Sequence, residues 1–353
     1  MTSKGCPAST IHSLIYMPAS RSRVRLLELQ DELGQVYAEL RGEPDYQLGV
    51  GGDIEQHPDV KKLKKAIHEE QERLKKPSFV LNPDSEIRHA DLVVIDEVSM
   101  VGDKIAEDLL SFGVKILVLG DPAQLPPVKG TGYFTEAKPD RMLTEIHRQA
   151  AGNPIIDMAT RVRKGQKLEA GMYGDSQVLY GKPDRDLVMN ADQILVGKNL
   201  TRRQINAQVR RLLGRGCDDL PVSGDKVVCL RNDHEMGLLN GTLWEVIEAE
   251  PIHGMELMSL TVDPEMGSAS ITCSAHTHYF KGIEDQLPYY EIREAQCFDH
   301  GYALTAHKAQ GSQWSNVFIF DESKVFRHNA KRWLYTAITR AADRVTICRN
   351  HRR

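Results

Sequence analysis

Two acidic residues that directly follow a short apolar run are the first candidates for chemistry in this chain. Residues Leu92 to Ile95 are all apolar, and Asp96 and Glu97 come next. An apolar run this short predicts a strand that is buried on both faces of a parallel sheet. Ligands bind at the carboxyl ends of such strands. At that position Asp96 could hold Mg²⁺, and Glu97 could orient and deprotonate an attacking water.

A second polar loop is expected at the same edge of the sheet. The apolar run 115–119 is followed, after one glycine, by Asp121, which predicts a neighbouring parallel strand. Gln124 lies in the proline-rich loop that comes next, where its amide could hydrogen-bond a terminal phosphate or the attacking water. The alternative is that Asp96 and Glu97 merely cap the following helix, because acidic residues favour helix N-termini. The second loop at this spacing favours the nucleotide site.

The segments DEVSM and GDPAQLPPV, which begin at Asp96 and Gly120, resemble motifs II and III of superfamily 1 DNA helicases in the RecD/Dda-like branch. Further segments resemble motifs Ib, IV, V with Va, and VI of the same family, in the family's order: ASTIHSLIY, LTEIHRQ, FDHGYALTAHKAQGSQWSNVFIF and WLYTAITRAADRVTI. The resemblance covers nearly the whole chain from residue 8 onward. An ordered set of motifs is far more specific than any one of them.

The resemblance implies an ATP-dependent DNA helicase. Members of this branch translocate 5′ to 3′ on single-stranded DNA and separate duplexes, in DNA replication, recombination or repair. ATP and Mg²⁺ are the implied cofactors, and single-stranded DNA and junctions of single with double strands are the implied substrates. Recombination or replication proteins are candidate partners, no membrane is implied, and the implied location is the cytoplasm of a bacterial or phage-infected cell.

The resemblance also implies roles for individual residues around the nucleotide. Those implied in catalysis are Glu97, Gln124, Arg148 and Arg340. Those implied in nucleotide binding are Asp96, which also holds the metal, Asp121, Gln124, Arg148, Gly311 and Arg340. Arg148 and Arg340 would stabilise charge on the transferring phosphoryl group, the second only when two domains close. The alternative for Arg148 is a surface arginine near a helix start.

A second set of polar residues is implied at the DNA. It consists of Thr10, His12, Asn199, Arg202, Thr305, His307 and Lys308. Thr10 and His12 could contact phosphates without reading sequence, or could be ordinary residues of a loop and a helix start. The other members of the set lie in the segments around Asn199 and in motif V, where hydroxyl, imidazole and ammonium groups can bind phosphate.

The helix expected after the strand 194–196 carries an open question. Thr201 and Gln204 stand at capping-box spacing near its start. The arginine-rich face to which Arg202 belongs could lie beside DNA or could simply be solvated.

Three aromatic residues are expected to pack in the core, with base stacking as the alternative: Trp314, Trp333 and Tyr335.

One expected motif has no counterpart in the sequence. A nucleotide site of this class needs a GxxxxGK[ST] loop, whose backbone N–H groups and lysine cradle the phosphates, and the sequence contains none. The simplest explanation is an N-terminal truncation before motif Ib, or a gene model that begins at an internal Met. Two alternatives follow: a helicase remnant that binds nucleic acid without hydrolysing ATP, and a scaffold subunit of a recombination complex.

The elements that must position these residues form an α/β protein of several domains. The resemblance implies two RecA-like parallel-sheet motor domains, an incomplete one in residues 1–150 and another in residues 151–220 with 289–353. Apolar residues at helical spacing from Leu26 to Leu40 predict a helical insertion over about residues 17–80, the implied domain 1B. Short alternating apolar runs predict a small β-barrel over residues 221–288, the implied SH3-like domain 2B.

Composition sets limits on these interpretations. The chain of 353 residues is 27% charged and 41% hydrophobic, which is ordinary for a globular protein with room for two or three domains. The formal net charge of −4 excludes a uniformly basic coat but leaves room for a locally basic groove. The 6 cysteines form no CxxC pair, so neither a zinc ribbon nor a disulfide framework is indicated. No apolar run approaches membrane-spanning length, and the first residues show no signal-peptide pattern.

Overall fold

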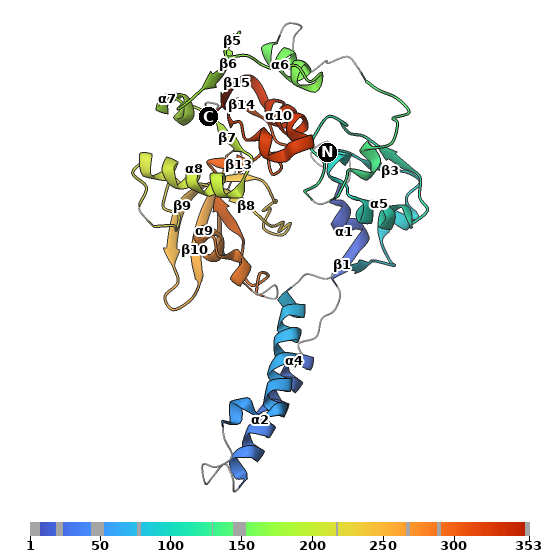
Figure 1. Cartoon of the computed structure of the whole chain (residues 1–353), viewed down its shortest axis with the longest axis vertical. Helices are drawn as coiled ribbons and strands as arrows, with labels where there is room; N and C mark the ends of the chain where they lie inside the picture. Colours follow the sequence, from blue (N-terminus) through green and yellow to red (C-terminus); the bar gives the residue numbers. More distant parts are fainter. Residues whose placement is uncertain are drawn as a thin grey trace. The chain divides into compact units, whose positions relative to one another are not determined.

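A computed structural model describes residues 8–18, 24–43, 53–75, 79–128, 130–143, 153–216, 218–265, 269–287 and 291–349, without the side chains of residues 72, 74 and 75 (Figure 1). The chain divides into two compact units. The smaller comprises Met1–Ser85 and Ile283–Ala295, and the larger comprises Glu86–Gly282 and Gln296–Arg353. The larger unit is mixed α/β with parallel sheets, which confirms the expected fold class in its broad form.

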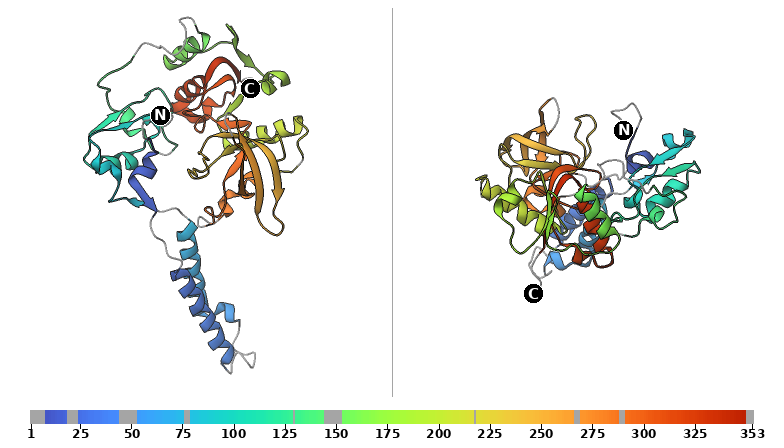
Figure 2. Two further views of the ribbon diagram at one scale, coloured as in Figure 1. Left: turned by 180° about the vertical axis from the view of Figure 1, so that it is seen from behind. Right: turned by 90° about the horizontal axis from the view of Figure 1, so that it is seen from above.

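An antiparallel sheet of five strands, in the order β11-β10-β9-β8-β12, belongs to the larger unit. The strands are β8 Lys226–Cys229, β9 Leu243–Pro251, β10 Leu257–Pro264, β11 Ile271–His276 and β12 Phe298–His300. The long strands β9 and β10 lie side by side (Figure 2). Met258, Leu260 and Val262 alternate along β10 and are all fully buried, so one face of this sheet packs on a core.

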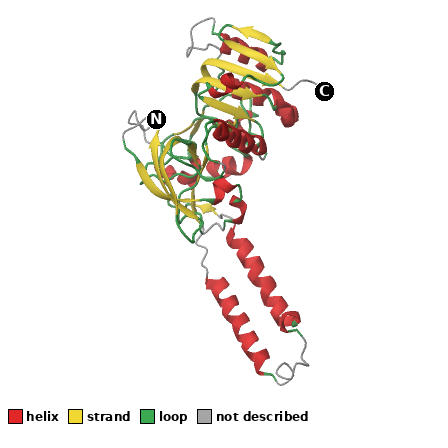
Figure 3. Ribbon diagram, turned by 90° about the vertical axis from the view of Figure 1, so that its left-hand side faces the viewer, coloured by secondary structure: helices red, strands yellow, loops and turns green. Residues whose placement is uncertain are grey.

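The smaller unit contains two long helices, which come between the two strands of a short antiparallel sheet in the chain. Its elements are α1 Ile11–Ile15, β1 Tyr16–Pro18, α2 Val24–Gly42, η2 Ile54–Gln56, α4 Pro58–Lys75, β2 Phe79–Leu81 and η6 Glu284–Gln286. Strands β1 and β2 pair antiparallel, and α2 and α4 lie side by side (Figure 3). Leu29 and Leu40 of α2 are buried, as are Val60 and Leu63 of α4, because each helix has one apolar stripe.

The largest sheet has six strands in the order β13-β7-β14-β15-β6-β5. They are β5 Gly171–Tyr173, β6 Ser176–Tyr180, β7 Gln193–Val196, β13 Ala303–Thr305, β14 Trp314–Phe320 and β15 Ala341–Arg349. All neighbours pair parallel except β5 and β6. The main helices joined to this sheet are α6 Pro154–Arg163, α8 Asn199–Leu212 and α10 Ala330–Ile338.

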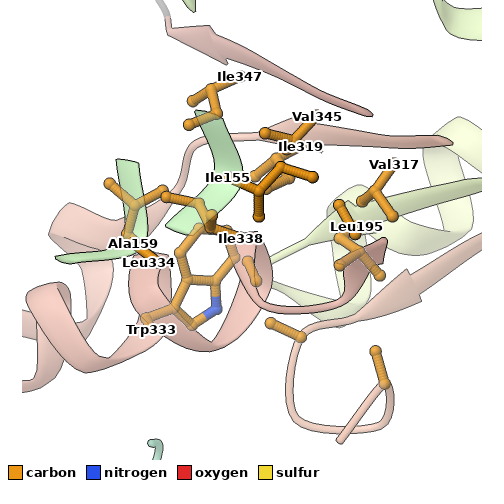
Figure 4. Packing of buried hydrophobic residues seen from close by; sticks show 14 of the residues in the cluster. Ile155, Ala159, Leu195, Val317, Ile319, Trp333, Leu334, Ile338, Val345 and Ile347 are labelled. Atoms are coloured by element: carbon orange, nitrogen blue, oxygen red, sulfur yellow. The ribbon is translucent and has the colours of Figure 1, made fainter. Parts of the chain in front are cut away.

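The core of the six-stranded part gathers around Trp333. Figure 4 shows this indole with Leu334 and Ile338 of its own helix α10 and with Ile155 and Ala159 of α6. Trp333 has no exposed surface, so the packing interpretation holds for it and base stacking does not. Strand β7 is buried along its whole length, as expected for a central strand of a parallel sheet.

The strand before Asp96 forms a separate sheet of two parallel strands, β3 Val93–Ile95 and β4 Ile116–Val118. The parallel pairing agrees with the sequence, but the expected burial on both faces is wrong. Val94 and Leu117 pair across the sheet and are 50% and 47% exposed. A sheet of two strands has few neighbours to cover it, so one of its faces stays open among the described residues.

The remaining elements are short. They are η3 Glu86–His89, η4 Val98–Met100, α5 Asp103–Leu110, η5 Tyr133–Thr135, α7 Arg185–Met189, α9 His278–Lys281 and η7 Ser323–Asn329. Among the helices that the structure describes, none is both long enough and apolar enough to cross a membrane.

Candidate nucleotide site and nucleic-acid interface

Asp96 and Glu97 lie at the carboxyl end of β3, where the backbone turns sharply. Glu97 has φ 54° and ψ 42°, a left-handed conformation that costs a residue with a β-carbon about 1–2 kcal/mol. Its N–H donates to Oδ1 of Asp96 at 2.9 Å. Gly102 is the N-cap of α5, and Glu97 makes no side-chain capping bond to η4, so the interpretation of these acids as helix caps is wrong. Strained backbone of this kind is often found at ligand sites.

The loop after β4 is docked on the six-stranded part of the same unit. Leu125 is 1% exposed and belongs to the core around Trp333. Its N–H donates to Oγ1 of Thr336 at 2.9 Å, and its carbonyl accepts from Nε2 of Gln310 at 3.3 Å. Gln124 is thereby held beside α10, and its Oε1 is buried with no hydrogen-bond partner among the described residues.

Asp121 stands at the start of this loop, and its carboxylate accepts two hydrogen bonds. The N–H of Ala123 donates to Oδ1 at 2.9 Å, and the hydroxyl of Tyr335 donates to Oδ2 at 2.6 Å. Burial of Tyr335, together with Asp121, raises the pKa of the hydroxyl, so it stays protonated at neutral pH. The sequence marked Tyr335 for packing or stacking, because no local pattern shows a partner 214 positions away.

Six of the predicted nucleotide residues line one cavity of about 880 Å³. They are Asp96, Glu97, Asp121, Gln124, Gly311 and Arg340. Asp96 and Asp121 come from the ends of two adjacent parallel strands, as the sequence predicted. Arg163, at the end of α6, also lines the cavity, and no motif had marked it. The cavity therefore has three predicted carboxylates at the end of the two-stranded sheet, and two guanidinium groups with the carboxylate of Asp343 from the six-stranded part.

Arg340 follows α10 and is held by backbone carbonyls. Its Nε donates to the carbonyl of Thr336 at 3.2 Å, and its Nη1 donates to that of Ser312 at 3.1 Å. The negative end of the helix dipole favours a cation at this position. Gly311 directly precedes Ser312 and has φ 82°. A β-carbon at Gly311 would meet no neighbouring atom, but this backbone conformation would be strained.

The lining of this cavity fits a nucleotide with a divalent cation. Carboxylates are ligands that Mg²⁺ prefers, and guanidinium groups match phosphate oxygens. The unpartnered Oε1 of Gln124 offers an acceptor to a ligand or a water. No group of three His, Cys, Asp or Glu side chains within the described ranges could hold a metal alone. Mg²⁺ is usually bound through one or two carboxylates together with phosphate oxygens and water.

Three of the predicted DNA residues lie at the end of β13 and in the turn that follows it: Thr305, His307 and Lys308. The N–H of Lys308 donates to Oγ1 of Thr305 at 3.3 Å, and its Nζ donates to Oδ1 of Asn240 at 3.2 Å. The His307 ring lies 5.4 Å from that of Phe326. Burial lowers the pKa of His307, so the imidazole is neutral at pH 7, and burial also lowers the pKa of Lys308.

Lys308 lines a second cavity, of about 660 Å³, together with the turn at Asn240 and Trp314. The segment Gly311–Gln313 lines both this cavity and the one that contains Asp96. One turn of the chain thus separates the predicted nucleotide side from the predicted DNA side.

Two of the four arginines of α8 are buried, whereas Arg203 and Arg211 are exposed, as a solvated face would have them. Arg202 is 9% exposed, and its Nη1 donates to Oδ2 of Asp299 at 2.6 Å. Its Nε donates to Oδ1 of Asn199 at 3.3 Å. Arg210 is 4% exposed and ion-paired with Asp225, which has no exposed surface. For these two arginines the solvated interpretation is wrong, and we assign to Arg202 the joining of α8 to β12.

The start of α8 also differs from the predicted capping box. The helix begins at Asn199, and a distant carboxylate occupies its N-terminus. Oε2 of Glu322 accepts from the N–H groups of Gly197 and Lys198 at 2.8 and 2.9 Å, and Oε1 accepts from Oγ1 of Thr201 at 2.7 Å. A carboxylate at this end satisfies free N–H groups and the positive end of the helix dipole.

Thr10 and His12 belong to the smaller unit. Thr10 is the N-cap of α1, with its Oγ1 accepting from the N–H of Ser13 at 3.3 Å. The His12 ring lies 5.3 Å from that of Tyr16 and 6.4 Å from that of Phe79. Their predicted DNA contact stays a prediction. Arg148 lies outside the described residues.

Two family models match the chain. One, described as an AAA domain, covers residues 2–182, just over half of the chain, and the other, described as a UvrD-like helicase C-terminal domain, covers residues 300–348. The ATP-dependent RecD2 DNA helicase of Deinococcus radiodurans is 32% identical over 282 residues, which is 72% of this chain and 36% of that protein. The chain belongs to the AAA domain family, among the RecD-like superfamily 1 helicases. The resemblance inferred from the order of the motifs is thereby confirmed.

Other relatives of this RecD-like chain include a probable conjugal transfer protein TraA of Sinorhizobium fredii, 26% identical over 70% of this chain and 23% of that protein. The matched region thus spans well under half the length of either relative. Among solved structures, the Pif1 helicase from Candida albicans has a TM-score of 0.47 at 19% identity, covering 87% of this chain and 79% of that one. Bacteroides Pif1 with ADP-AlF3 and ssDNA has a TM-score of 0.46 at 18% identity, covering 76% and 74%.

Proposed function

We propose that this chain is the catalytic part of an ATP-dependent DNA helicase that translocates 5′ to 3′ on single-stranded DNA and unwinds duplexes, in replication, recombination or repair. The observation that carries the proposal is the convergence of carboxylates, an amide and an arginine on one cavity. These groups come from segments that are far apart in the sequence. The relative named RecD2, an ATP-dependent DNA helicase, supports the same conclusion.

The predicted catalytic and metal-binding residues would each act in ATP hydrolysis according to the chemistry of their side chains. Bound ATP with Mg²⁺ supplies the phosphoryl group and part of the charge compensation. Asp96 would hold the metal, while Glu97 would orient the attacking water and accept its proton. Gln124 directs its amide to the same water or to the terminal phosphate. Arg340 stabilises the negative charge that develops on the phosphoryl oxygens, with Arg148 as the second arginine.

Coupling of hydrolysis to DNA runs through the turn Gly311–Gln313. This segment lines both cavities, and the carbonyl of Ser312 accepts from the guanidinium of Arg340. A shift of Arg340 towards a phosphate would release that carbonyl. The turn that carries Lys308, Thr305 and His307 would then change its grip on single-stranded DNA or on a junction of single with double strands.

The proposal includes a division into domains. Residues 1–150 form the first RecA-like domain with the helical domain 1B at about 17–80, and residues 151–220 with 289–353 form the second. The antiparallel strands within residues 221–288 correspond to the SH3-like domain 2B. The helical pair α2 and α4 and the strands β8 to β11 support these assignments.

The test is ATP hydrolysis by the full chain, measured with and without single-stranded DNA. We expect hydrolysis that DNA stimulates and that Glu97→Gln abolishes, while DNA binding persists. Glu107→Gln is the matched control, because Glu107 is exposed on α5 and does not line the cavity. Unwinding of substrates with only a 5′ or only a 3′ tail would test the direction. Equal hydrolysis in the wild type and in Glu97→Gln would overturn the assignment of Glu97.

A second candidate function rests on one observation, the lack of a GxxxxGK[ST] segment in the sequence. In that case the chain binds nucleic acid without hydrolysing ATP. Salt-sensitive binding to single-stranded DNA, combined with no hydrolysis at any ATP concentration, would favour this candidate.

A further inference from the structure

The loop after β4 and the helix α10 are joined by two hydrogen bonds that span more than 200 positions of the sequence. The hydroxyl of Tyr335 donates to Oδ2 of Asp121 at 2.6 Å, and the N–H of Leu125 donates to Oγ1 of Thr336 at 2.9 Å. Leu125 is also buried in the core around Trp333. The loop is therefore attached to α10 at two points, with Gln124 between them.

The same turn of α10 also holds Arg340. The carbonyl of Thr336 accepts from Nε of Arg340 at 3.2 Å, while the hydroxyl of Thr336 accepts from the loop. Tyr335 lines the cavity beside Asp121, and its ring packs against the core around Trp333. The adjacent residues Tyr335 and Thr336 thus connect the Gln124 side of the cavity with the Arg340 side.

We propose that Tyr335 is a positioning residue for the hydrolysis proposed above: its hydroxyl holds Asp121, so that the loop bearing Gln124 and the helix bearing Arg340 keep one geometry across the cavity. The inference rests on the proposed function for its catalytic consequence. The attachment itself can be measured without any catalysis. A hydrogen bond to a charged acceptor changes an equilibrium constant by roughly tenfold or more, which sets the size of the expected effects.

The first measurement is amide hydrogen exchange in the full chain without nucleotide. Tyr335→Phe removes the hydroxyl and keeps the ring, and we expect exchange of the 121–127 segment to become roughly tenfold faster. Tyr173→Phe is the matched control, since the Tyr173 hydroxyl donates to the carbonyl of Glu169 at 3.0 Å and its residue does not line the cavity. Exchange in that segment should be unchanged in the control. Equal exchange in Tyr335→Phe and wild type would overturn the attachment.

A second variant guards against a trivial loss of structure. Thr336→Val keeps the shape of this fully buried side chain and removes the acceptor for the N–H of Leu125. It should raise exchange at Leu125 in the same way. If Tyr335→Phe failed to fold, Thr336→Val would decide alone. Exchange at Leu125 that is as slow in Thr336→Val as in the wild type would then overturn the attachment.

The catalytic consequence is read from kcat and KM for ATP. A positioning role predicts that Tyr335→Phe lowers kcat roughly tenfold while KM changes little, and that Asp121→Ala combined with Tyr335→Phe is no worse than Asp121→Ala alone. A rise of KM at constant kcat would overturn positioning in favour of direct nucleotide contact. Faster exchange in a chain whose wild type shows no hydrolysis would support the attachment and contradict the proposed function. If the wild type hydrolysed ATP and Tyr335→Phe changed neither the exchange nor kcat, the proposed function would be supported and the attachment contradicted.

Discussion

The larger unit contains a two-stranded parallel sheet and a mostly parallel six-stranded sheet, each with predicted site residues at strand ends, and the two sheets bury their strands very differently. In the six-stranded sheet, every residue of β7 is buried. In the two-stranded sheet, Val94 and Leu117 are 50% and 47% exposed, and the flanking Leu92 and Leu119 are 51% and 43% exposed. Similar apolar runs followed by polar residues thus lead to opposite burial, because burial depends on how many neighbouring strands and helices a sheet has.

The comparison shows how the cavity obtains its geometry. In the six-stranded part, Arg340 follows the helix α10, which packs directly on a large core. The two-stranded part carries Asp96 and Glu97 on a small frame, and its loop is anchored by inserting Leu125 into the core of the other part. The carboxylate side of the cavity is therefore positioned largely by its attachment to the arginine side.

The largest effect is expected for Asp225→Ala, because this carboxylate joins α8, which packs with the six-stranded sheet, to the start of β8. This carboxylate is fully buried and accepts from Nε of Arg210 at 3.0 Å and from the hydroxyl of Tyr302 at 2.8 Å. Removing it leaves a buried arginine unpaired, which should lower the free energy of unfolding by about 3–5 kcal/mol in urea titrations. Asp157→Ala, in the exposed pair with Arg161, should cost less than about 1 kcal/mol. Equal costs would mean that the buried pair of Arg210 and Asp225 stabilises the fold no more than the exposed pair does.

The anchoring of the two-stranded part is tested by Leu125→Ala. This side chain is 1% exposed, so we expect a loss of about 2–5 kcal/mol in the free energy of unfolding. Leu119→Ala, just before the same loop and 43% exposed, should cost less than about 1 kcal/mol. Urea or thermal unfolding measures both. If Leu119→Ala were the costlier change, the loop would not depend on the core for its anchoring.

Glu322 offers a pH-dependent test of the frame. Its burial favours the neutral form, but hydrogen bonds from Thr201, Lys198 and Gly197 outweigh this and lower the pKa below its ordinary value of 4.5. Because the folded pKa is lowered, the contribution of Glu322 is complete above pH 4.5 and is lost as the pH falls through the folded pKa. Glu322→Gln should cost about 1–2 kcal/mol at neutral pH, and less in acid. A constant cost at every pH would contradict the ionised cap.

The smallest effect is expected on the open face of the two-stranded sheet. Val94→Thr replaces a half-exposed methyl by a hydroxyl and should change the free energy of unfolding by no more than about 0.5 kcal/mol. The same change in β7, Val196→Thr, buries an additional hydroxyl and should cost about 1–3 kcal/mol. Similar costs at both positions would show that the face bearing Val94 is covered in solution.

Local sequence determined where the strands begin and end and which polar residues follow them. The apolar runs before Asp96 and Asp121 predicted two parallel strands, and the carboxyl ends of such strands meet at one edge. That is why four of the cavity residues could be grouped from the sequence. The resemblance of the segment that begins at Trp333 to motif VI likewise pointed to Arg340.

Only the tertiary structure decided which groups meet across long separations. The hydroxyl of Tyr335 finds Asp121, the carboxylate of Glu322 finds the start of α8, and Arg202 pairs with Asp299 rather than with solvent. The open face at Val94 was equally hidden from the sequence. The apolar periodicity of a segment reflects its own geometry, whereas burial and hydrogen-bond partners depend on neighbours that the fold brings from elsewhere in the chain.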